Sequence, residues 1–200
     1  TELRLSGSSG PGCTDLYQTL YVAAIPEPPP GPWLAAFATQ TDPFDPLRFE
    51  THVVRIDPDA PAVETMLCLP TEYPQSIAGG PDGSIWTTWL PSLRFNPSNL
   101  EFESILLDDL YDAGLDSVWG VAIDPVDGAA YYAGSHLDRS ILTNVGSIIR
   151  RDPVTDLYAP YVEEESLQAF ERIAADPAGS IAAVAGDGVS FSDRLLRVDP

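Results

Sequence analysis

The sequence predicts an all-β fold in which short four-stranded sheets repeat along the chain, the architecture of a β-propeller. Two observations lead to this prediction. First, an apolar run, a proline-containing turn and a second apolar run recur three times. These units are centred on Pro81, Pro125 and Pro177, so the spacings are 44 and 52 residues. Second, an apolar pair, an arginine and an Asp-Pro step recur in residues 53–58, 148–153 and 195–200.

The repeat divides the chain into an N-terminal segment and four blades. Residues 1–16 are rich in Gly and Ser and are predicted to form a linker or a strand that closes the ring. The tight turns between strands A and B and between strands C and D follow from Pro-Asp-Gly and Asp-Pro steps, which supply the backbone angles that such turns need. The predicted blades are 17–69, 70–115, 116–166 and 167–200, with the last one incomplete.

Apolar runs between these turns give the expected strands. In the first blade they are 20–25, 33–37, 50–56 and 61–68, and in the second 74–79, 84–89 and 101–107. A degenerate copy of the arginine landmark is expected at 104–109 in the second blade. The third blade should use 118–123, 129–134, 146–151 and 156–162, and the fourth 171–175, 180–185 and 193–198.

The turn motifs carry a family resemblance. Residues 77–86 read Ile-Ala-Gly-Gly-Pro-Asp-Gly-Ser-Ile-Trp, and residues 55–58 read Arg-Ile-Asp-Pro. They resemble the repeat of virginiamycin B lyase-like propellers and the related NHL repeats, over roughly residues 50–200. The resemblance implies a ring of six or seven blades, of which this chain supplies about four. A small closed four-bladed ring is the alternative. Such lyases use a His/Glu constellation with a divalent metal, and no matching pair of histidines can be placed in this chain.

The chain is strongly acidic, with 30 Asp and Glu residues against 10 Arg and no Lys, and a formal net charge of −20. This charge argues against nucleic acid and anionic membranes as partners. No apolar run reaches the roughly 20 residues that span a bilayer. A protein, a glycan or a small molecule is therefore the expected partner.

The chain has two cysteines, Cys13 and Cys68, and neither lies in a metal-binding pattern. A disulfide between them would fit an oxidising compartment, and two buried free thiols are the alternative. Together with the acidity, this favours an extracellular, periplasmic or cell-surface location.

Long loops are predicted to gather on one face of the propeller. The B–C loops at 38–49, 90–100, 135–146 and 186–192 and the D–A loops at 108–117 and 163–169 are long. Binding residues concentrate in such loops when a rigid scaffold carries them. The expected binding residues on this face are Trp89, Phe95, Asp108, Asp109, Tyr111, Asp112, Asp138 and Arg139.

Metal binding and catalysis receive weaker support from the sequence. Asp108, Asp112 and Asp116 offer carboxylates to Ca²⁺ or Mg²⁺, and a solvated acidic rim is the simpler interpretation of them. His136 is the candidate general base, and an ordinary loop histidine is the alternative. We therefore predict an exported, non-catalytic binding module. A metal-assisted lyase or lactonase of the propeller type is the second hypothesis, and a structural spacer is the third.

Overall fold

The computed structural model describes residues 33–42, 45–56, 63–70, 76–88, 92–96, 101–105, 107–140, 142–164, 166–186 and 193–198. Several sequence predictions lie outside these residues. They are the linker at 1–16, the first strand at 20–25, Trp89, and Cys13 with its predicted disulfide.

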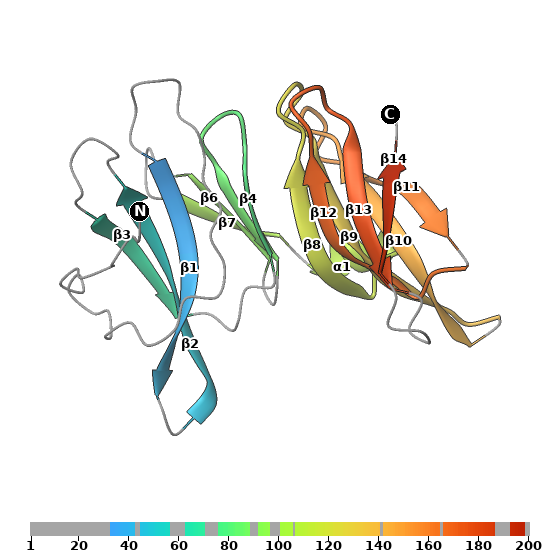
Figure 1. The fold of residues 1–200 in the computed structure, drawn as a ribbon, viewed down its shortest axis with the longest axis horizontal. Coiled ribbons are helices and arrows are strands. Elements are labelled where there is room, and N and C mark those ends of the chain that lie inside the picture. Colours follow the sequence, from blue (N-terminus) through green and yellow to red (C-terminus); the bar gives the residue numbers. More distant parts are fainter. Residues whose placement is uncertain are drawn as a thin grey trace.

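The described residues form four antiparallel sheets that follow one another along the chain (Figure 1). Sheet 1 contains β1 (Trp33–Asp42), β2 (Asp45–Ile56) and β3 (Val63–Pro70). Sheet 2 contains β4 (Ser76–Gly79), β5 (Ile85–Thr88), β6 (Ser92–Asn96) and β7 (Glu101–Ile105). After the helix α1 (Leu107–Asp112), sheet 3 contains β8 (Ser117–Ile123), β9 (Ala130–Asp138), β10 (Thr143–Arg151) and β11 (Tyr158–Glu164). Sheet 4 contains β12 (Ala169–Ala175), β13 (Ile181–Gly186) and β14 (Asp193–Val198).

The all-β prediction is confirmed, and so are the strands predicted for sheets 3 and 4. Each of these sheets runs in chain order, because every strand pairs with the next one along the chain. The Asp-Pro steps at 124–125, 152–153 and 176–177, which the structure describes, form turns as expected. Their aspartates accept hydrogen bonds from backbone amides two residues ahead, Asp124 from Val126 at 2.7 Å and Asp176 from Ala178 at 2.8 Å. Such side-chain bonds replace the ladder bonds that the backbone loses at a turn.

The strand assignment in sheet 2 is wrong at its third strand. The structure places β6 within the loop predicted at 90–100, and residues 101–105 form the fourth strand, β7. The landmark expected at 104–109 is therefore found in β6 instead, where Leu93-Arg94-Phe95-Asn96 is followed by Pro97. Asparagine stands here where the other copies have aspartate. Both residues favour turns through the same side-chain mechanism, so the substitution hides the repeat in the sequence.

Two of the predicted long loops are strands in the structure. The segment 38–49 belongs mainly to β1 and β2, which pair as far as Asp42 and Asp45. The segment 135–146 continues β9 and β10, whose pairing extends to Asp138 and Thr143. Two paired strands satisfy each other's backbone groups, so the pairing can continue through these segments. Most of the predicted loop at 186–192 lies outside the described residues.

Sheet 3 lies between sheets 2 and 4 and shares an apolar layer with each (Figure 1). Side chains alternate along a strand, so neighbouring residues enter different layers. Tyr132 packs with Trp86 and Ile149 on the side of sheet 2. Tyr131 packs with Phe170 of sheet 4. Sheet 3 therefore positions the side chains of α1 and of the β9–β10 hairpin.

The turn that joins β10 to β11 gives a pH-dependent prediction. Hydrogen bonds from the backbone amides of Thr155 and Val154 lower the pKa of Asp152 from 3.8 to about 2. A carboxylate with a lowered folded-state pKa contributes stability above its unfolded pKa and loses it as the pH falls through the folded pKa. We expect Asp152→Asn to flatten the fall in unfolding free energy between pH 3.8 and about 2.

Urea denaturation at a series of pH values measures this effect. Val154→Ala in the same turn keeps the backbone amides and should retain the full fall in unfolding free energy. The prediction would be contradicted if the unfolding free energy of Asp152→Asn fell as steeply between those pH values as that of the unmodified protein.

Candidate functional site

The helix α1 is anchored by apolar residues and presents acidic ones. Leu110 is fully buried and Leu115 is 2% exposed, and both join the apolar layer between sheets 2 and 3. Gly114 has φ of 100°, which suits glycine, and its amide donates to the carbonyl of Tyr111 to end the helix. The outward side chains are Asp108, Asp109, Tyr111 and Asp112, all exposed.

Asp108 and Asp109 lie in the first turn of α1, where negative charge interacts favourably with the helix dipole. This placement gives two of the predicted ligand-binding carboxylates a simple role in stabilising the helix.

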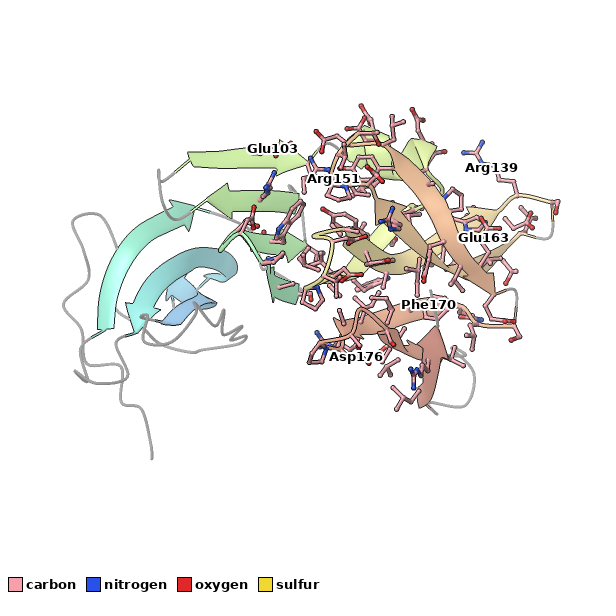
Figure 2. All side chains as sticks on the ribbon, turned by 90° about the horizontal axis from the view of Figure 1, so that it is seen from above. Glu103, Arg139, Arg151, Glu163, Phe170 and Asp176 are labelled. Atoms are coloured by element: carbon pink, nitrogen blue, oxygen red, sulfur yellow. The ribbon has the colours of Figure 1, made fainter. Side chains whose placement is uncertain are left out.

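The β9–β10 hairpin lies beside α1 and is joined to it by a side-chain contact. The guanidinium of Arg139 donates to the hydroxyl of Tyr111 at 3.1 Å. Asp138 accepts hydrogen bonds from the amide and hydroxyl of Ser140, at 2.7 and 2.6 Å. Figure 2 shows Arg139 at the end of the hairpin, away from the sheet. Arg139 therefore connects the hairpin to the helix.

Asp116 connects the hairpin to the start of β8. Its carboxylate accepts a hydrogen bond from the amide of Leu137 at 2.5 Å, and its own amide donates to the carbonyl of Ser135 at 2.9 Å. These bonds continue the pairing of β8 with β9 beyond the strand end. The hairpin and the loop after α1 therefore form one preformed unit.

Three large apolar side chains are exposed on this unit. Tyr111 is 52% exposed, Leu137 is 44% exposed and Leu142 is 79% exposed. We call this region the α1–hairpin surface, and its members are Asp108, Asp109, Tyr111, Asp112, Asp116, Leu137, Asp138, Arg139 and Leu142. It combines three exposed large side chains with five aspartates and one arginine.

The structure brings together six residues that the sequence analysis selected: Asp108, Asp109, Tyr111, Asp112, Asp138 and Arg139. Their role in binding stays a prediction. Phe95 was expected in a long loop and instead lies in β6 of sheet 2. Leu137 and Leu142 were missed, because only charged and aromatic residues were sought in the segment 135–146.

His136 was also expected in a loop, and it lies in β9 opposite Val145 of β10. Its Nδ1 atom is buried and has no hydrogen-bond partner. The extra length of β9 is the reason, since it carries the histidine into the sheet. A buried, unpartnered nitrogen is a poor position for a general base that must reach a substrate.

The predicted metal carboxylates are not gathered into one set of ligands. Asp108 and Asp112 lie on α1, while the carboxylate of Asp116 bonds the amide of Leu137. Within the described ranges, no three residues of the types His, Cys, Asp and Glu lie close enough together to hold a metal ion. The same ranges contain no helix that is long and apolar enough to cross a membrane.

No family model matches the chain, and no curated protein matches it. Its fold is similar to a solved nidogen/laminin complex, which contains a β-propeller, with a TM-score of 0.52 and 13% sequence identity. That alignment covers 82% of this chain and 60% of the other. The chain therefore spans less than two thirds of the length of the structure that it resembles.

Two crystal structures of the BT4673 extracellular domain from B. thetaiotaomicron, a putative one-component or hybrid two-component system, match with TM-scores of 0.45 and 0.44 and 12% identity. These alignments cover 81% and 100% of this chain and 24% and 29% of the other chains. At such identities a likeness concerns the fold alone. The nidogen/laminin match supports a propeller-like arrangement of antiparallel sheets.

Proposed function

We propose that this chain is part of an exported β-propeller that binds a protein partner through the α1–hairpin surface and performs no catalysis of its own. One observation carries the proposal. The exposed Tyr111 accepts a hydrogen bond from Arg139 of the neighbouring hairpin, and the same hairpin carries the exposed Leu137 and Leu142. A fixed aromatic side chain in an apolar centre with a charged rim is the usual anatomy of a protein interface.

The charge of the surface indicates the kind of partner. Five of its nine residues are aspartates, and the whole chain has a formal net charge of −20. Complementary charge speeds association and excludes partners of the same sign. We therefore expect a basic segment with at least one apolar side chain that contacts Tyr111, Leu137 or Leu142.

The surface is also ordered before binding. Asp116 fixes Leu137, and Asp138 fixes the turn that carries Arg139. Groups that are already held in place lose less conformational entropy when a partner binds. This favours direct docking over a loop that folds around its ligand.

The turn motifs support a larger ring of the virginiamycin B lyase-like or NHL type, with six or seven blades. A lyase of that type would require a basic residue beside a metal site. The buried Nδ1 atom of His136 and the separation of the predicted metal carboxylates favour binding over that alternative.

Peptide selection tests the proposal. A displayed library of random 12-residue peptides would be panned against the immobilised protein, and the affinity of selected peptides measured by calorimetry. We expect basic peptides whose affinity falls roughly 30-fold or more with Tyr111→Ala, as for a residue central to an interface. Tyr111 is 52% exposed and its hydroxyl bonds Arg139 at the surface, so the fold should persist.

Val154→Ala is the matched control, because Val154 is 88% exposed at the opposite end of sheet 3. The affinity of Val154→Ala for the selected peptides should equal that of the unmodified protein. Peptides that bind Tyr111→Ala as tightly as Val154→Ala would contradict the proposal. A glycan array whose signal disappears with Tyr111→Ala, in the absence of peptide binding, would replace the protein partner with a carbohydrate.

A further inference from the structure

A row of three residues, one from each of three neighbouring strands, crosses the same face of each of the last three sheets. It runs from an alanine in the first strand, through the second strand, to an arginine in the third. The rows are Ala78–Trp86–Arg94 in sheet 2, Ala122–Tyr131–Arg150 in sheet 3 and Ala174–Ala182–Arg197 in sheet 4. The first two rows have an aromatic residue at the centre, and the third has alanine.

In sheets 2 and 3 this row forms the interface with the following sheet. Trp86 is 4% exposed and lies between Arg94 of its own sheet and Arg151 of sheet 3, with each guanidinium carbon 5.1 Å from the ring. Tyr131 is 3% exposed and packs with Phe170 of sheet 4. The row therefore marks the side of a sheet on which the next sheet packs.

In sheet 4 the equivalent side is open. Leu195 is 76% exposed, whereas Ile148, the residue at the corresponding position of sheet 3, is fully buried. Ala174 and Arg197 are exposed, and Ala182 and Val184 are half-buried. We call this side the outer face of sheet 4, and it consists of Arg172, Ala174, Ala182, Val184, Leu195 and Arg197.

The central alanine leaves room that an aromatic ring fills in the other two rows. Packed interfaces place large side chains opposite small ones, so the volume over Ala182 must be supplied by the covering element. Arg197 lies directly across from Ala182 and donates to the hydroxyl of Ser180 at 3.2 Å. A guanidinium at that position offers a stacking partner to an aromatic ring.

We propose that the outer face of sheet 4 is an inter-sheet interface, and that its occupant is a further antiparallel sheet of the same repeat. That sheet places an aromatic side chain on Ala182, beside Arg197. The two existing interfaces supply the precedent, since the same row is buried by a following sheet in both. This inference is independent of the proposed partner at the α1–hairpin surface, which lies on α1 and the hairpin of sheet 3.

Cysteine labelling of the protein in its natural length tests the proposal. Leu195→Cys would be treated with a maleimide, and peptide mass spectrometry would report its rate separately from Cys13 and Cys68. Val154→Cys is the exposed control, at 88% exposure, and Ala133→Cys is the buried control, at 0%. We expect residue 195 to react at least tenfold more slowly than residue 154, at every protein concentration.

Equal rates at residues 195 and 154 would overturn the proposal. Protection that disappears on dilution would also overturn it, because a second copy would then be the occupant.

A second variant tests the aromatic contact itself. Ala182→Trp should collide with the incoming ring and raise the labelling rate of residue 195 towards that of residue 154, while Ala182→Gly should leave it slow. If Ala182→Trp remains protected, no large side chain lies on Ala182, and that part of the proposal is wrong.

Discussion

Replacing Gly134 by alanine is expected to destabilise the fold by about 3 kcal/mol or more, the upper range for overpacking a buried site. A Cβ atom at this position would lie 2.9 Å from the carbonyl carbon of Ser117, closer still to its oxygen, and 3.0 Å from the side chain of Leu115. The Ser117 atoms are backbone atoms of β8, so no rotation of a side chain can relieve the contact.

Relief would require β8 to move away from β9. Gly134 pairs with Val118, immediately before the irregularity in register between Val118 and Gly120. Asp116 fixes the same stretch to the hairpin through the amide of Leu137. The movement would therefore break backbone hydrogen bonds on both sides of the substitution, and chemical denaturation would show a lower midpoint with little change in slope.

Gly146→Ala provides the comparison. Its Cβ would meet ring atoms of Phe170 at 3.2 Å, and a side chain can shift by a few tenths of an ångström. We expect a cost of about 1 kcal/mol for this variant. If Gly134→Ala costs no more than Gly146→Ala, β8 is free to move and the rigid connection described above is wrong.

The turns and strands of sheets 3 and 4 could be predicted because their signals are local. An aspartate before proline defines a turn through its own side chain, and the apolar runs on each side alternate as strands do. The same rule failed for β6, since Asn96 replaces the aspartate. A search that treated Asn-Pro and Asp-Pro as one signal would have found Arg94 in register with Arg150 and Arg197.

The sequence analysis assigned Tyr111 and Arg139 to long loops on one face, and the structure joins them by a hydrogen bond. It did not predict the geometry of this region. The length of β9 depends on its pairing with β10 rather than on the residues of β9 alone, so His136 was assigned to a loop. The exposure of Leu137 and Leu142 likewise depends on which neighbours pack against them.

The contacts between sheets are the part of the structure that is hardest to predict from the sequence. Arg150 and Arg151 are adjacent and chemically identical, yet they face opposite sides of sheet 3. Arg150 bonds Asp127 at 2.8 Å within its own sheet, while Arg151 reaches Glu103 of sheet 2 at 3.2 Å. Figure 2 shows Glu103 and Arg151 on facing sides of these two sheets. Only the alternation of a strand, once its register is known, separates the two roles.

Trp86 holds this interface together, and its replacement should show it. The indole nitrogen donates to the hydroxyl of Ser84 at 2.8 Å, and the ring is enclosed by two guanidinium groups. We expect Trp86→Ala to lower the free energy of unfolding by about 3–5 kcal/mol, as large-to-small changes of buried aromatic residues do. Denaturant unfolding measures the loss.

A double-mutant cycle then separates the two arginines. The side chain of Arg151 is 6% exposed and that of Arg94 is 34% exposed, at the same distance from the ring. A cation–π contact is stronger where water is excluded, about 2 kcal/mol against about 0.5–1 kcal/mol at exposed sites. The coupling of Trp86 with Arg151, measured with Arg151→Met, should therefore exceed that measured with Arg94→Met. Equal couplings would mean that the two cation–π contacts are equally exposed to water. Sheet 3 would then not exclude water from this face of sheet 2. The same reasoning would then weaken the expectation that a further sheet seals the outer face of sheet 4.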